Sequence, residues 1–70
     1  MKYYRVYSAE KKHVETFDYY GNAVATARKL KGHVVKWDSE DDVPEYVLSW
    51  KNGKMCWFEV VDEFMKGVEK

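Results

Sequence analysis

The first 18 residues of the chain follow a two-residue alternation of side chains that is typical of β-strands. Residues 2–9, KYYRVYSA, and residues 13–18, HVETFD, are both rich in Tyr, Val, Thr and Phe, which favour a pleated backbone. A short polar link, AEKK, joins the two runs. We therefore expect the chain to begin with an antiparallel β-hairpin.

The pattern then changes to a helical spacing in residues 18–32, DYYGNAVATARKLKG. The apolar stripe of this segment is formed by Tyr20, Ala23, Val24, Ala27 and Leu30. Its small residues would let the helix lie close against a sheet. Asp18 is the expected N-cap, with Asn22 as the alternative, because either side chain can accept bonds from the free amides of the first turn. Gly32 is expected to be the left-handed residue at the end.

Three further segments follow the helix. Residues 33–37, HVVKW, predict a strand, and residues 38–45, DSEDDVPE, predict an acidic loop. The dipeptide Asn52-Gly53 indicates a two-residue hairpin turn of type I′, because that turn needs positive φ at both positions.

The hairpin around this turn has two different faces. One face carries large apolar side chains, namely Tyr46, Leu48, Trp50, Met55 and Trp57. They complement the small residues of the helix in size, so we expect them in the core. The other face is mixed, and Phe58 and Val60 at its base need a second cover.

The tail of the chain, residues 62–70, is the candidate for that cover. Phe64 and Val68 would lie on one side of a short helix, although Gly67 weakens a helix there. The order β-β-α-β-β-β then predicts a single α+β domain over residues 1–70. Its sheet is largely antiparallel, with one main helix packed on a face and a short C-terminal helix.

Composition limits the class of protein. Three Trp, six Tyr and three Phe supply the large side chains that the core of a 70-residue chain needs. The single cysteine, Cys56, cannot form an internal disulfide or a cysteine-pair zinc site. No apolar run suits a signal peptide or a membrane span, so we expect a cytoplasmic protein without membrane contact.

The charges are unevenly distributed along the chain although they sum to zero. Residues 1–37 hold eight Lys and Arg against three acids, a balance of +5. Residues 38–70 hold four Lys against nine acids, a balance of −5. Such an asymmetry indicates either two oppositely charged surfaces or halves that neutralise each other within one fold.

No catalytic motif can be recognised around the polar side chains. His13, His33 and the serines Ser8, Ser39 and Ser49 lie outside any known nucleophile context. The acidic loop lacks the central glycine and the full spacing of an EF-type calcium loop. We therefore predict a protein that is not an enzyme, with no metal and no cofactor.

The leading hypothesis is a protein–protein interaction module, with a homodimer as one form. The chain has more aromatic side chains, Tyr19 among them, than a core under one helix can bury. Exposed aromatic side chains mark interaction sites. An open sheet also has edge strands that can pair with another chain. The candidate contact residues are Tyr3, Tyr7, Trp37, Phe58, Asp38, Glu40, Asp41 and Asp42.

The alternative is a nucleic-acid-binding module that uses the basic end of the helix and the strand tyrosines. Tyr3 and Tyr7 share a strand face with a cation, an arrangement that can stack bases. The candidate cations are Arg5, Arg28, Lys29, Lys31 and Lys36, with Lys11 and Lys12 nearby. Two observations weigh against this class. The helix dipole alone favours cations at a helix C-terminus, and the pI is only about 6.7.

The run TFDYYGNAVATARKLKG, residues 16–32, resembles the strand-to-helix joint of many small bacterial and phage proteins. It carries no functional motif and implies no particular family. Small size, one domain and the lack of a catalytic motif also suit an accessory protein of a phage or mobile element that binds and modulates a host protein.

Overall fold

The computed structural model describes residues 2–40, 43–58 and 61–68, with the backbone alone at residues 57, 58, 61 and 62. Along the chain the elements are β1 (Lys2–Tyr7), β2 (His13–Phe17), α1 (Tyr20–Leu30), β3 (His33–Asp38), β4 (Val43–Lys51), β5 (Lys54–Phe58) and α2 (Val61–Lys66). The predicted order of elements and the α+β class are confirmed.

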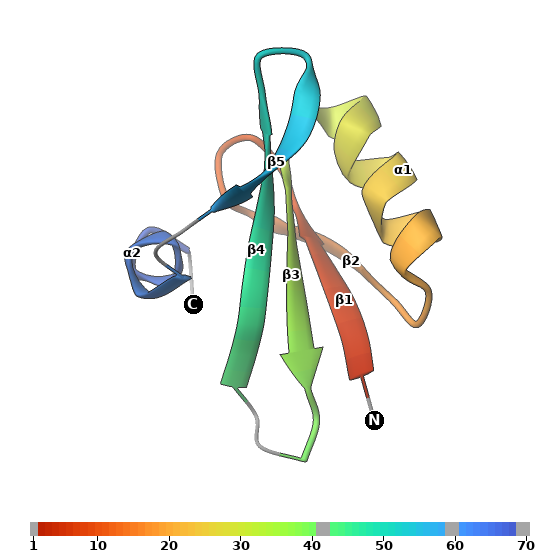
Figure 1. Cartoon of the computed structure of the whole chain (residues 1–70), viewed down its shortest axis with the longest axis vertical. Helices are drawn as coiled ribbons and strands as arrows, with labels where there is room; N and C mark the ends of the chain where they lie inside the picture. Colours follow the sequence, from red (N-terminus) through yellow and green to blue (C-terminus); the bar gives the residue numbers. More distant parts are fainter. Residues whose placement is uncertain (1, 41–42, 59–60, 69–70) are drawn as a thin grey trace.

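The strands form one antiparallel sheet in the order β2-β1-β3-β4-β5 (Figure 1). The β1–β2 and β4–β5 hairpins lie where the sequence predicts them. In the second hairpin Trp50 is opposite Met55, and Asn52 and Gly53 have φ values of 53° and 83°, as a type I′ turn requires. The connection through α1 brings β3 back beside β1, so the centre of the sheet joins segments far apart in sequence.

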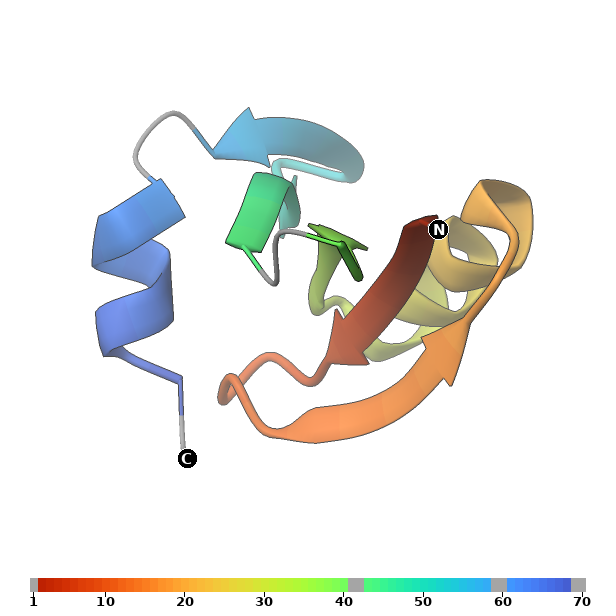
Figure 2. The ribbon, with the colours of Figure 1, turned by 90° about the horizontal axis from the view of Figure 1, so that it is seen from below.

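The two helices lie on opposite sides of the sheet (Figure 2). On the side of α1, called the α1 face, Ala23 and Ala27 pack against Val6, Val34 and Leu48, and all five are buried. The small helix residues therefore meet larger strand residues, as predicted.

On the other side, called the α2 face, Phe64 of α2 is fully buried against Tyr7, Val35 and Val47. Val68, just after the helix, also packs on this cluster. The predicted cover by the C-terminal segment is confirmed. The expected partners Phe58 and Val60 lie outside the described side chains, so their part in this contact is not described.

Both predicted caps of α1 are wrong. The N-cap position is Tyr19, which makes no side-chain cap bond, so neither Asp18 nor Asn22 caps the helix. At the other end Lys31 is the left-handed residue, with φ 53° and ψ 42°, and its N–H bonds to the carbonyl of Arg28. Gly32 serves a different need. A Cβ there would lie 2.0 Å from the Tyr7 carbonyl oxygen, so close packing of backbones requires glycine.

The predicted acidic loop over residues 38–45 is shorter than expected. Asp38 ends β3, and β4 already begins at Val43. A shift in register between Lys36 and Trp37 on the β3–β4 ladder accommodates this early start. Among the described residues the pairing of β4 with β5 begins at Val47, so Pro44 lies beyond that pairing, in an edge environment that tolerates proline.

Candidate functional site

Three segments that are separate in sequence meet at one end of the long axis of the molecule, the top in Figure 1. They are the β1–β2 loop, the C-terminal end of α1 and the β4–β5 hairpin. Their cations are Lys11, Lys12, Arg28, Lys29, Lys31, Lys51 and Lys54, which we call the basic end. Glu10 is the one acid in residues 8–12, 28–31 and 50–54, so seven cations against one acid give a balance of +6.

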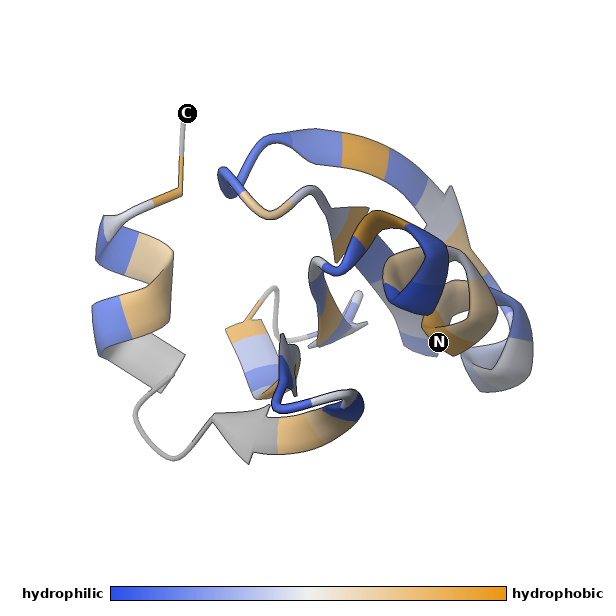
Figure 3. Cartoon of the chain, turned by 90° about the horizontal axis from the view of Figure 1, so that it is seen from above, coloured by the Kyte–Doolittle hydropathy of each residue, from blue (hydrophilic) through white to orange (hydrophobic). Residues whose placement is uncertain are grey.

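All of these cations except Lys11 face solvent. Six of the seven are exposed, and Lys11 is half-buried because its Nζ lies 5.1 Å from the centre of the Phe64 ring. Within the part of the chain that the structure describes, none of them forms an ion pair. Figure 3 looks onto this end and shows hydrophilic residues at the end of α1, in the β1–β2 loop and at the hairpin turn. Positive charge is therefore concentrated and not neutralised locally.

Backbone hydrogen bonds fix the segments that carry the basic end. The N–H of Trp50 in β4 bonds to the carbonyl of Gly32 at 2.9 Å, which ties the hairpin to the end of α1. Ser8 donates its N–H to the Lys12 carbonyl at 2.8 Å and closes the β1–β2 loop. Lys11 and Lys31 both have positive φ, 66° and 53°. Glycine or asparagine would adopt that conformation with less strain, so backbone geometry alone does not account for lysine there.

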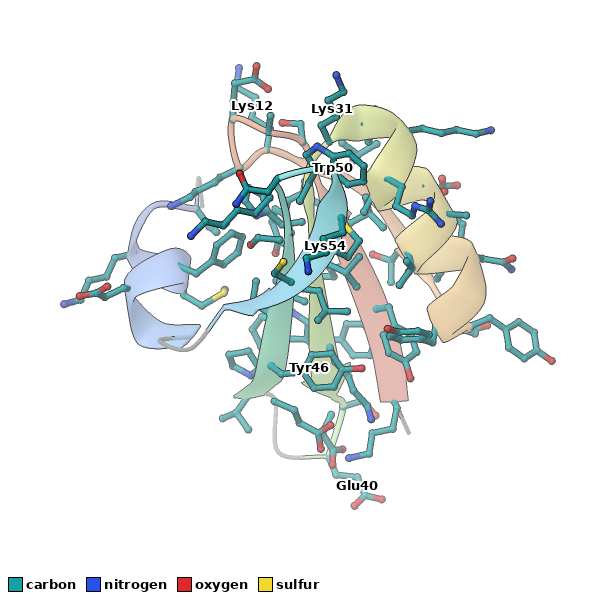
Figure 4. The ribbon with its side chains drawn as sticks, turned by 45° about the horizontal axis from the view of Figure 1, so that its top comes forward. Lys12, Lys31, Glu40, Tyr46, Trp50 and Lys54 are labelled. Carbon is teal, nitrogen blue, oxygen red and sulfur yellow. The ribbon has the colours of Figure 1, made fainter. Side chains whose placement is uncertain are left out.

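Trp50 lies among these cations, and its predicted place in the core is wrong. It is half-buried and does not belong to the buried cluster under α1. Its side chain lies beside the C-terminal end of α1 (Figure 4). Together with Ala25, Arg28 and Lys29 it lines a shallow hollow of about 360 Å³. The short side chain of Ala25 leaves this space open.

The opposite end of the molecule is acidic and internally paired. Lys2 bonds to both Asp38 and Glu45, and Nζ of Lys36 lies 3.4 Å from the second oxygen of Glu45. These bonds raise the pKa of Lys2 above its ordinary value and lower the pKa of Glu45. The pKa of Asp38 is also lowered, first by the Glu40 N–H that it accepts at 3.0 Å and then by Lys2.

The predicted acidic contact residues therefore have different environments. Asp38 is held in that network, whereas the Glu40 side chain is exposed at this end (Figure 4). Asp41 and Asp42 lie outside the described residues. The structure therefore describes two of the four predicted acidic contact residues, Asp38 and Glu40.

The predicted nucleic-acid residues are divided between two places. Arg28, Lys29 and Lys31 meet at the basic end, but Arg5 and Lys36 do not. The guanidinium of Arg5 lies on the α2 face, 5.0 Å from the Trp37 ring, and Lys36 is paired with an acid on the other face. The missed cations Lys51 and Lys54 flank the Asn52-Gly53 turn. They lie in the half of the sequence that is acidic overall.

The predicted aromatic contact residues also have different environments. Tyr7 is only 2% exposed because α2 covers it, and its ring meets that of Phe64 edge-on at 5.9 Å. It therefore offers no surface for a base or a partner. Tyr3 and Trp37 stack with ring centres 6.4 Å apart and are half-buried. The Phe58 side chain lies outside the described residues.

His33 and Ser49 form the one close histidine–serine pair among the described side chains, with Nδ1 and Oγ 2.7 Å apart. The Phe64 ring packs against the imidazole, with centres 4.8 Å apart. Burial lowers the pKa of His33, so the neutral ring is favoured, while a hydrogen bond to the backbone of Ala9 acts in the opposite direction. The pair thus connects β3 and β4 to the β1–β2 loop beneath the basic end.

The described residues offer neither a metal site nor a membrane-spanning helix. Among those residues, no three His, Cys, Asp or Glu side chains gather in positions that could hold a metal ion. No helix there is long and apolar enough to cross a membrane.

Comparisons with protein-family models, curated proteins and solved structures found no match to this chain.

Proposed function

We propose that the protein is a non-enzymatic module that binds nucleic acid at its basic end. The observation that carries this proposal is the gathering of seven cations from three separate segments at one end of the molecule, where Arg28 and Lys29 share a hollow with the half-exposed Trp50. Clustered Lys and Arg side chains bind phosphates and release the counterions of the nucleic acid, which supplies most of the sequence-independent affinity. An aromatic side chain among such cations is typical of nucleic-acid surfaces.

The helix dipole does not explain this cluster. It accounts for Arg28, Lys29 and Lys31, because cations near a helix C-terminus are favoured. The remaining four lysines belong to the β1–β2 loop and the β4–β5 hairpin, where no helix ends. Their presence at the same end calls for a reason outside α1, and an anionic partner is such a reason.

The zero net charge does not weaken the proposal either. The molecule extends 33 Å along its longest axis, and the paired acidic network lies at the far end from the cations. In physiological salt the Debye length is about 8 Å, so charges at the far end are largely screened. A phosphate that approaches the basic end therefore meets mainly a positive field.

We expect the double variant Lys29→Gln/Lys31→Gln to bind DNA roughly 10- to 100-fold more weakly at low salt, because each lost phosphate contact removes part of the counterion release. The measurement is fluorescence anisotropy with a labelled strand of about 15 nucleotides, a length near the upper end of single-domain sites. Both lysines are exposed, so the fold should remain unchanged.

The matched control is Tyr19→Glu/Asn22→Glu, which changes the net charge by the same amount at the other end of α1. Both side chains are exposed, and acids near a helix N-terminus are tolerated. This control should bind almost as tightly as the original protein. Equal loss in both variants would mean that net charge, and not the basic end, governs binding.

The second candidate function is contact with another protein, including a second copy of the chain, through the α2 face. It is favoured by the cluster of Tyr3, Arg5 and Trp37, which lies on that face and is only half-buried. Light scattering over a tenfold concentration range would then show a mass that rises with concentration in the original protein and stays constant in Tyr3→Glu. A constant monomer mass in both would rule out self-association through this cluster.

A further inference from the structure

The hollow beside Trp50 indicates which form of nucleic acid the basic end selects. We propose that Trp50 is a stacking platform for an unpaired base, so that the protein prefers single strands over duplexes. This inference rests on the proposed function, because Arg28 and Lys29 on the rim must hold the flanking phosphates. It adds a specific role for Trp50, the one aromatic side chain among the described residues that line the hollow.

The position of Trp50 suits that role. Trp50 is not a member of the apolar cluster under α1, whose buried residues include Ala23, Ala27 and Leu48. Its backbone is held by the 2.9 Å bond to Gly32 and by the adjacent type I′ turn, so the position of the residue is fixed before binding. A half-exposed aromatic ring at a fixed backbone position is suited to stack on a ligand.

The size and surroundings of the hollow are consistent with one nucleotide. The hollow of about 360 Å³ is open to solvent, so a base on the indole would be held on one side and not enclosed. Arg28 and Lys29 line it from the last turns of α1. A base in a duplex is stacked between its neighbours and paired, so it cannot reach the indole without being flipped out, at a cost of a few kcal/mol. An unpaired strand avoids that cost.

The test compares three ligands of equal length by anisotropy at one salt concentration. They are an oligothymidylate strand, the same strand with abasic sites in place of its bases, and a duplex. The thymidylate strand should bind roughly 5- to 150-fold more tightly than the abasic strand, the range expected for stacking of a base on an aromatic ring. In Trp50→Leu this difference should disappear, while affinity for the abasic strand is unchanged. Trp50→Phe should restore most of it.

Three outcomes separate the two proposals. If thymidylate and abasic strands bind equally to the original protein, the stacking role is wrong but phosphate binding at the basic end stands. The stacking role is also wrong if Trp50→Leu loses affinity for both strands equally. If none of the three ligands binds, both proposals fail. The circular dichroism spectrum and unfolding midpoint of Trp50→Leu show whether the variant is folded, and Trp50→Phe provides the test if it is not.

Discussion

Replacing Gly32 by alanine is expected to lower the free energy of unfolding by about 3 kcal/mol or more. The added Cβ would lie 2.0 Å from the Tyr7 carbonyl oxygen and 3.0 Å from the carbonyl carbon of Ser8. Both are backbone atoms at the end of β1, so no side-chain rotation can relieve the contact. Overpacking against a fixed backbone falls at the upper end of typical losses. A 70-residue domain has only about 4–10 kcal/mol in total.

Thermal unfolding followed by circular dichroism measures this effect, and the midpoint should fall by roughly 12–24 °C. The control is Gly21→Ala, in the first turn of α1, where an added Cβ meets nothing within 4 Å. Alanine is the better helix former by about 1 kcal/mol, so this variant should be as stable as the original protein or slightly more so. A Gly32→Ala protein with an unchanged midpoint would contradict the packing of the α1–β3 joint against β1.

The second large effect is expected at Phe64, the main anchor of α2. Its side chain is fully buried, and its ring contacts those of Tyr7 and His33. Truncation of a buried phenylalanine to alanine costs about 3–5 kcal/mol, because transfer energy is lost and a cavity remains. Phe64→Ala should therefore remove most of the stability of the domain, as measured by urea unfolding.

Two further variants make this result specific. Phe64→Leu keeps an apolar side chain at the site and should cost clearly less than the alanine variant. Glu63→Ala changes an exposed neighbour on the same short helix and should stay within about 0.5 kcal/mol of the original protein. Similar losses in Phe64→Ala and Glu63→Ala would mean that α2 does not cover the sheet through Phe64.

The parts of the fold that depend on short-range patterns were predictable from the sequence. Asn52-Gly53 set the turn and thus the register of β4 and β5, since a two-residue loop allows one pairing. The helical spacing of residues 20–30 gave α1 and, through Ala23, Val24 and Ala27, the face that it packs, but Tyr20 and Leu30 of the predicted stripe are exposed. The caps were not predictable, because the left-handed residue and the close backbone approach fell on neighbouring positions, Lys31 and Gly32.

The basic end was predictable only in part. The cations of α1 follow one another in sequence, and so they were recognised together. Lys51 and Lys54 were missed because they belong to the half of the sequence whose charge balance is negative. The two halves of the sequence do not form separate regions of the fold, and the hairpin lies at the same end of the molecule as the end of α1. Trp50 was assigned to the core because alternation shows which face a side chain is on. It does not show whether the helix that covers this face extends far enough to bury that side chain.

The measurement that tests the central proposal most directly is the salt dependence of DNA binding, in the original protein and in Lys29→Gln/Lys31→Gln. Log affinity against log salt should have a slope of roughly −2 to −5, as expected for three to seven phosphate contacts of a single strand. In the double variant the slope should become shallower by about 1.4, since two contacts are lost. A slope near zero, or one that is the same in both proteins, would contradict binding of phosphates by the basic end.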